Sequence, residues 1–149
     1  SASAATLAAE YLAVRDPTAV EFRPGAKTVL EYARERAHVG LITNGGRPTQ
    51  TKKLRTLGIE DAFDVQVFTE PSAGIGPKPS AAPFERALTA LNVAPDAAIH
   101  VGDSLHADVA GANAMGLDSA WLDLGRDDGP GEHDPTYELA SLERLETIV

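Results

Sequence analysis

Two carboxylates, Asp103 and Asp108, follow a short apolar run that ends at Val101. The run predicts a buried strand, and the two acids are expected on the turn and helix after it. Carboxylate oxygens beyond the carboxyl end of a parallel strand are suited to holding a hard divalent cation such as Mg²⁺. The alternative is that Asp103 only caps the next helix and Asp108 is an exposed helical residue. The spacing of the two acids favours phosphate chemistry.

A second polar segment, Thr43-Asn44-Gly45, closes the apolar run 38–43. The threonine hydroxyl and the next backbone N–H groups could converge on one phosphate oxygen. Glycine lets the backbone approach an anion, and the start of the following helix adds its positive end. An ordinary strand-to-helix turn is the competing interpretation of this segment.

Lys78 is one of four lysines and lies between Pro77 and Pro79 in a loop rich in glycine and proline. Two flanking prolines stiffen the backbone, so the ammonium group can be anchored where it neutralises a phosphoryl group and a nearby carboxylate. A solvated loop lysine is the alternative.

Helices and strands are expected to alternate along most of the chain. The patterns predict helices over 3–14, 26–36, 48–57, 80–91, 104–115 and 139–148, strands over 38–43, 63–69, 97–101 and 117–122, and loops over 70–79 and 125–135. This alternation predicts an α/β fold, a Rossmann-like three-layer sandwich with a mostly parallel sheet. Such folds bind ligands beyond the carboxyl ends of the strands, where all three polar segments fall.

Composition excludes several classes of protein. A chain of 149 residues is about one domain, and without cysteine it can form neither disulfides nor a thiolate zinc site. A net charge of −9 argues against nucleic-acid binding. No apolar run approaches the ~20 residues that span a bilayer, so we expect no membrane association and a cytoplasmic location. The sequence does not indicate an oligomeric state.

The three segments, in this order, resemble motifs of the haloacid dehalogenase-like hydrolase superfamily, phosphatase type. Residues 41–45 are similar to its second motif, 76–79 with Phe84 to its third, and 102–108 to its fourth. The resemblance covers the chain from about Phe22 onward. It implies that Thr43 binds the transferring phosphoryl group with Asn44 and Gly45. It also implies that Lys78 offsets charge on the nucleophile and phosphate, and that Asp103 ligates Mg²⁺ with Asp108 as a second ligand or a support.

The family's first motif, Asp-x-Asp after a central strand, has no match here. Asp16 is the sole aspartate before Thr43, and Pro17 follows it. We therefore expect the first-motif strand to be missing from the middle of the sheet. The chain is then the carboxyl-terminal part of a longer protein, with 1–16 as the end of a helical cap and 17–149 as the α/β core.

The resemblance implies a Mg²⁺-dependent phosphohydrolase that acts on a small phosphorylated metabolite through an aspartyl-phosphate intermediate. A metal-free 2-haloacid dehalogenase and a non-catalytic phosphate- or partner-binding module are the alternatives. This chain alone is expected to show no detectable hydrolysis, because it lacks the nucleophile. Arg47 could meet an anionic substrate, whereas His100 is expected to be an ordinary strand residue and His106 an exposed helical one.

Overall fold

The computed structural model describes residues 4–8, 12–16, 19–22 and 24–148, and its main feature is a parallel β-sheet. The described strands of this sheet follow the order β5 (Val65–Val67), β4 (His38–Ile42), β1 (Ala4–Ala8), β6 (Ala98–Gly102), β7 (Asp118–Leu122) and β8 (Tyr137–Leu139). Each neighbouring pair is parallel. A separate antiparallel pair is formed by β2 (Leu12–Asp16) and β3 (Ala19–Phe22).

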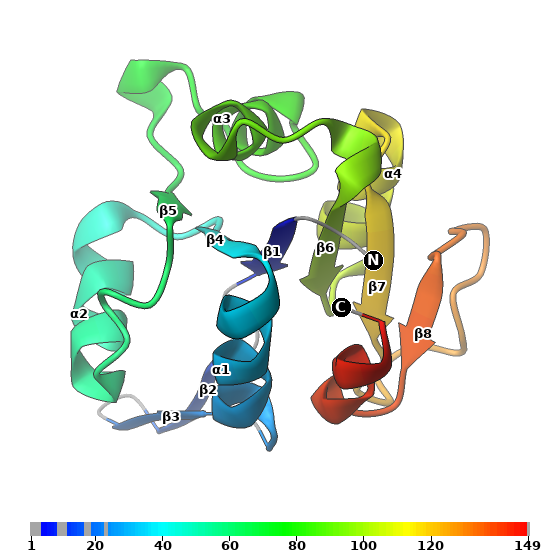
Figure 1. Ribbon diagram of the computed structural model, residues 1–149, viewed down its shortest axis with the longest axis horizontal. Coiled ribbons are helices and arrows are strands. Elements are labelled where there is room, and N and C mark those ends of the chain that lie inside the picture. The colour runs from blue at the N-terminus through cyan, green and yellow to red at the C-terminus, as the bar shows by residue number, and fades with distance from the viewer. Residues whose placement is uncertain (1–3, 9–11, 17–18, 23, 149) are drawn as a thin grey trace.

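Helices lie on both sides of the sheet (Figure 1). The α-helices are α1 (Ala26–Arg36), α2 (Arg47–Leu57), α3 (Ala81–Leu91) and α4 (Ala110–Met115). Shorter 3-10 turns cover Pro71–Ala73, Pro95–Ala97 and Leu142–Thr147, and a turn of π-helix covers Leu105–Val109. The α3 and α4 helices share one face, whereas α1 packs beside the C-terminal 3-10 turn on the other.

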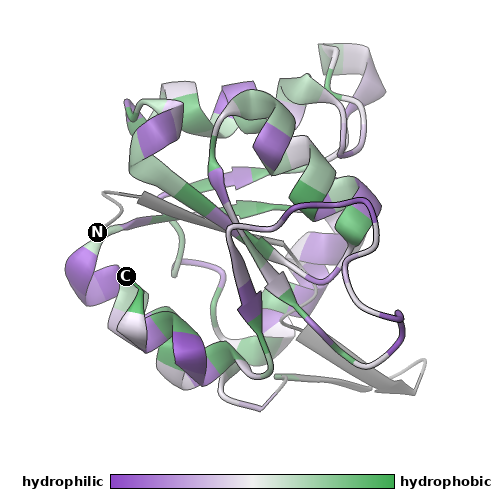
Figure 2. Cartoon of the chain, turned by 90° about the vertical axis from the view of Figure 1, so that its right-hand side faces the viewer, coloured by the Kyte–Doolittle hydropathy of each residue, from purple (hydrophilic) through white to green (hydrophobic). Residues whose placement is uncertain are grey.

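The apolar core is split by the sheet into two clusters. One contains Leu30 of α1, Leu54 of α2 and Leu142 near the C-terminus, and the other contains Phe84 and Leu88 of α3. Figure 2 shows that the helix ribbons mix green apolar and purple polar residues, as expected for helices with one buried face. Among the described helices, none is both long and apolar enough to cross a bilayer.

The predicted fold class is confirmed, and most element positions agree with the structure. The helix expected over 26–36 coincides with α1, and α2 ends before Gly58, which has a φ of 71°. A positive φ is tolerated by glycine, so Gly58 can end the helix without steric cost. The stretch 125–135 is irregular, as its composition predicts.

The helix predicted over 3–14 is wrong for 4–8 and 12–14, which lie in strands β1 and β2, while 3 and 9–11 lie outside the described residues. β1 lies between β4 and β6 and pairs with both, so the expectation that the middle strand of the sheet is missing is also wrong. Pairing on both sides satisfies the backbone groups of three strands, and this outweighs the weak helical periodicity of Leu7, Tyr11 and Val14. The sequence of β1 is Ala-Ala-Thr-Leu-Ala, so this strand does not supply the Asp-x-Asp motif.

Two other predicted helices are only partly correct. The segment 104–115 begins as the π-helical turn and becomes α-helical at Ala110. The segment 139–148 forms a 3-10 helix over Leu142–Thr147, and its first residue closes β8 instead. In the second case, strand pairing with β7 and packing of the 3-10 turn against α1 determine the local structure.

Candidate active site

The polar segments predicted from the sequence meet at the carboxyl ends of β4 and β6. These strands flank β1, in whose register Ala8 is opposite Ile42 and Leu7 is opposite Val101. Thr43 directly follows β4, and Asp103 directly follows β6. The site therefore lies where parallel α/β sheets commonly bind ligands.

Lys78 joins the two strand ends. Its Nζ donates to the carbonyl oxygen of Ile42 at 3.1 Å and to Oδ1 of Asp108 at 2.7 Å. The side chain is only 1% exposed. A buried ammonium without a partner would be costly, so these contacts fix Lys78 between the end of β4 and the segment after β6.

Asp108 is the centre of a buried polar cluster and is not an exposed helical residue. Its Oδ1 also contacts Nε2 of His100 at 2.9 Å, and its Oδ2 accepts from the backbone N–H of Ser104 at 3.1 Å. Burial alone would raise the pKa of Asp108, but the hydrogen bond from His100 and the charges of His100 and Lys78 lower this pKa to about 2. Both carboxylate oxygens are thus engaged by protein groups.

The contribution of His100 was missed by the sequence prediction, which treated it only as a strand residue. Its ring is fully buried in β6 and meets the ring of Phe84 edge-on, with 5.1 Å between centroids. Burial lowers the pKa of His100, although Asp108 acts in the opposite direction. The position of a histidine in an otherwise apolar strand could have indicated this contribution, because a buried polar group needs a hydrogen-bond partner.

Gly102 and the π-helical turn allow Asp108 to reach this position. A Cβ on Gly102 would lie 2.2 Å from Cγ of Asp108, so no other residue fits without a shift. The backbone N–H of Val109 donates to the carbonyl oxygen of Ser104 at 3.1 Å, which closes the wide turn. Such π turns occur often at functional sites.

Thr43 and Gly45 form a tight turn at the end of β4. The backbone N–H of Gly45 donates to Oγ1 of Thr43 at 3.1 Å, and Thr43 is buried. A Cβ on Gly45 would lie 2.2 Å from the side chain of Gln50 in α2. The turn at the end of β4 therefore lies close to helix α2, as the sequence predicts.

Asn44 links this turn to the loop that carries Lys78. Its Oδ1 accepts from the backbone N–H of Lys78 at 2.7 Å, and its Nδ2 donates to the carbonyl oxygen of Lys78 at 3.2 Å. The predicted role of Asn44 was phosphate binding. The paired side-chain contacts hold the Lys78 backbone, and the role of Asn44 in phosphate binding stays a prediction.

Asp103 lies at the edge of the cluster and opens onto a pocket. Its side chain is 5% exposed, and its backbone carbonyl accepts from Nε1 of Trp121 at 3.2 Å. The pocket has a volume of about 480 Å³ and is also lined by His106 and His133. The carboxylate Oδ2 forms an ion pair with Nη2 of Arg126, a residue that the sequence prediction did not consider.

Asp103 offers one carboxylate toward a divalent cation. Among the residues that the structure describes, no group of three or more His, Asp or Glu is placed to hold a metal ion. Mg²⁺ commonly uses one or two protein carboxylates and completes its shell with water and phosphate oxygens. The donor set therefore fits such a cation through Asp103, whereas Asp108 is occupied by Lys78 and His100.

Two other features do not belong to this cluster. Arg47 forms an ion pair with Glu70 at 2.5 Å and stacks over Phe68.

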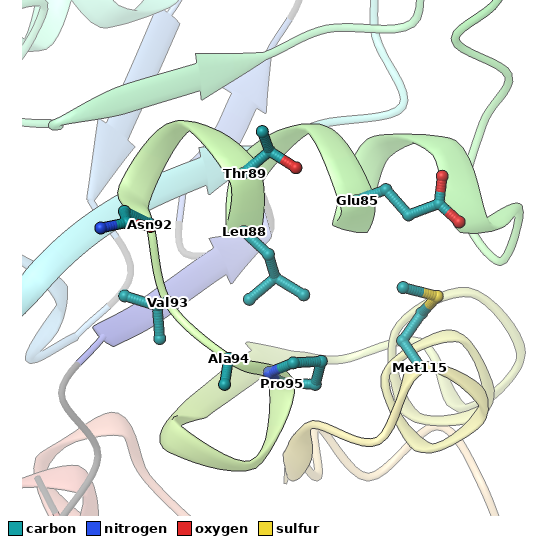
Figure 3. Close-up of a pocket in the computed structure, with 8 residues that line it drawn as sticks. All are labelled: Glu85, Leu88, Thr89, Asn92, Val93, Ala94, Pro95 and Met115. Carbon is teal, nitrogen blue, oxygen red and sulfur yellow. The ribbon is translucent and has the colours of Figure 1, made fainter.

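A second pocket, of about 490 Å³, lies between α3 and α4 and is lined by Leu88 and Met115, among others (Figure 3). Its wall includes residues that precede β6, so it is at the opposite end of the sheet from Asp103.

Comparison with known proteins agrees with this geometry. Residues 3–116 match the family described as haloacid dehalogenase-like hydrolase. The chain is 34% identical to pyrimidine 5'-nucleotidase YjjG of Escherichia coli over 85% of its length and 56% of the relative. It is 38% identical to glyceraldehyde 3-phosphate phosphatase of Pyrococcus furiosus over 69% of its length and 42% of the relative.

The fold is also shared with a solved structure. The HAD-hydrolase YfnB of Bacillus subtilis, solved bound to magnesium, superimposes with a TM-score of 0.78 and 28% identity. The match covers 86% of this chain and 56% of that one. The chain therefore belongs to the haloacid dehalogenase-like hydrolase family, and it spans about half the length of the curated relatives that it matches.

Proposed function

We propose that this chain forms the phosphate-binding and cation-binding part of a phosphohydrolase that acts on small phosphorylated metabolites. The observation that carries this proposal is the position of Lys78, which is buried and held between the end of β4 and Asp108. A fixed cation at this place can stabilise charge on a transferring phosphoryl group. The names of relatives such as glyceraldehyde 3-phosphate phosphatase support the same class of reaction.

The residues divide into two roles. The hydroxyl of Thr43, whose Oγ1 accepts from the backbone N–H of Gly45, would donate to an oxygen of the phosphoryl group, and Lys78 would neutralise its charge. Asn44 and Asp108 would keep Lys78 in place through its backbone and its Nζ, respectively. This assigns Asp108 a supporting role and leaves Asp103 as the carboxylate for the cation.

Asp103 would hold Mg²⁺, which supplies Lewis-acid stabilisation of the phosphoryl oxygens when bound. The carboxylate suits this purpose because it lies at the carboxyl end of β6 and opens onto the 480 Å³ pocket. Water and substrate oxygens would complete the coordination from the pocket side.

The nucleophile of the proposed aspartyl-phosphate step would be an aspartate of an Asp-x-Asp segment, which this sequence does not contain. We propose that this segment precedes the chain in a longer protein. Residues 4–8 form the central strand β1 of the sheet, so they belong to the α/β core and not to a helical cap. Attack on phosphorus would break the ester P–O bond, and water would then release phosphate and regenerate the aspartate.

The test is hydrolysis of p-nitrophenyl phosphate and a panel of small phosphorylated metabolites in the presence of Mg²⁺. A longer form with an upstream Asp-x-Asp segment should be active, whereas the 149-residue chain should not. Asp103→Asn should lower kcat/KM by at least about 100-fold, since it removes the protein's ligand to the cation. EDTA should have a similar effect.

Asp96→Asn is the matched control, because Asp96 is exposed and precedes the amino end of β6. It removes the same charge from the other end of the same strand, and its activity should equal that of the unmodified protein. Full activity in EDTA, or full activity of Asp103→Asn, would contradict the proposed cation site. Hydrolysis by the 149-residue chain itself would contradict the proposed origin of the nucleophile.

A further inference from the structure

Arg126 covers the carboxylate that is proposed to hold the cation. Its Nη2 contacts Oδ2 of Asp103 in an ion pair between a buried carboxylate and a guanidinium whose side chain is 62% exposed. Arg126 comes from the irregular segment after β7, and its side chain lies in the same pocket as His106 and His133. A nearly buried carboxylate needs a compensating cation, and the guanidinium supplies it here.

The position of Asp103 does not depend on this ion pair alone. Its backbone is held by the hydrogen bond from Trp121, which is itself fully buried. Removal of Arg126 would therefore leave the carboxylate at the end of β6. Arg126, in contrast, lies on an exposed segment between Gly125 and Asp127, so its side chain can leave the carboxylate with little loss of packing.

A divalent cation and the guanidinium of Arg126 would repel each other if both contacted Oδ2 of Asp103, so they compete for this oxygen. The exposed arginine is the partner that can move, since solvent compensates its charge after it leaves. Binding of a divalent cation to Oδ2 of Asp103 and binding of Arg126 to the same oxygen therefore oppose each other.

We propose that Arg126 is an exchangeable counter-ion of Asp103, which neutralises this carboxylate when no divalent cation is bound and is displaced into the pocket when one binds. This inference rests on the proposed cation site. It makes Arg126 a residue that lowers the affinity for the cation, and it places a free guanidinium beside the cation afterwards. That guanidinium would then face whatever anionic group of a substrate occupies the pocket.

The test is a titration of the 149-residue chain with Mn²⁺, followed by the electron paramagnetic resonance signal of the free ion. Arg126→Gln removes the competing charge, so its Kd for Mn²⁺ should fall roughly twofold to fivefold, the range that a partly exposed ion pair allows. Arg55→Gln is the matched control, because the side chain of Arg55 on α2 is 70% exposed and pairs with Glu60. This variant should bind like the unmodified chain, and Asp103→Asn should lose binding.

A second readout follows the arginine itself. Addition of Mg²⁺ to the ¹⁵N-labelled chain should shift the Nε–Hε resonance of Arg126 and leave that of Arg55 in place. The shift should be absent in Asp103→Asn.

The possible outcomes separate the inference from the proposed function. Unchanged or weaker Mn²⁺ binding by Arg126→Gln, with binding still lost in Asp103→Asn, would overturn the exchange and leave the cation site in place. Binding by neither the unmodified chain nor Arg126→Gln would overturn both. Tighter binding by Arg126→Gln and Arg55→Gln alike would reduce the effect to net charge and would also overturn the exchange.

Discussion

The two carboxylates of the 102–108 segment lie in different environments, although only four residues separate them. Asp108 is 1% exposed and contacts Lys78, His100 and a backbone N–H. Asp103 borders an open pocket, and its ionic partner Arg126 is mostly exposed. One carboxylate is closed within the protein, and the other can exchange partners.

This difference shows how one short motif can separate positioning from binding. The charged groups of the Asp108 cluster lose their hydration on folding, and fixed contacts within the protein compensate this cost. The geometry of the cluster is therefore set before any ligand binds. At Asp103 the ionic partner is exposed and the cost of exchange is small. We expect substitutions of Asp108 to affect folding and substitutions of Asp103 to affect binding.

The largest effect is expected from Asp108→Asn. This change leaves the ammonium of Lys78 buried without its counter-ion, which should lower the free energy of unfolding by about 3–5 kcal/mol. Urea denaturation followed by circular dichroism measures this loss.

Asp103→Asn is the control for this comparison, since it makes the same chemical change at the pocket. It should cost at most about 1 kcal/mol, because its ion pair is with an exposed arginine. Equal losses for the two variants would show that the closed and open environments do not differ energetically. A double variant, Lys78→Met with Asp108→Leu, should be more stable than Asp108→Asn, because it leaves no buried charge unpaired.

The free energy of unfolding should fall in two steps as the pH is lowered, one for each titratable group of the Asp108 cluster. The pKa of His100 is lowered from 6.5 by burial, so the unfolded chain binds a proton here more readily, and stability should begin to fall as pH drops below about 6.5. The pKa of Asp108 is lowered from 3.8 to about 2, so its contribution is present above pH 3.8 and is lost between pH 3.8 and about 2. The second step should amount to about 2 kcal/mol.

Free energies of unfolding measured from pH 7 to pH 2 will separate the two groups. His100→Gln should flatten the curve above pH 4, and Asp108→Asn should remove the step below it. A profile of the unmodified chain that is flat over this whole range would contradict the buried, charged cluster.

The same comparison explains which parts of the site the sequence could predict. Apolar runs and their order locate β4 and β6, and these fix Thr43 and Asp103 at one edge of the sheet. The burial of Asp108 depends on a π-helical turn and on two partners from other segments, Lys78 and His100. No local pattern encodes such a meeting of three segments.

The remaining differences have related causes. Leu7, Tyr11 and Val14 have helical spacing, but pairing of β1 with strands on both sides determines the structure there. Arg126 lies in a segment of glycine, proline and aspartate that has no periodicity, so nothing local connects it with Asp103. In both cases the structure depends on contacts between segments far apart in the sequence, which local sequence patterns do not predict.

Gly102→Ala should give a smaller effect than Asp108→Asn, and it most directly probes the fit of the closed cluster. The new methyl group would lie 2.2 Å from Cγ of Asp108, so the carboxylate has to move from Lys78 and His100. Overpacking of this kind costs roughly 1–3 kcal/mol, which thermal or urea unfolding can measure. Gly46→Ala is the matched control, because a Cβ there meets nothing within 4 Å and its φ is −78°. If Gly102→Ala proved as stable as Gly46→Ala, Asp108 would have room to move, and its role in holding Lys78 would be contradicted.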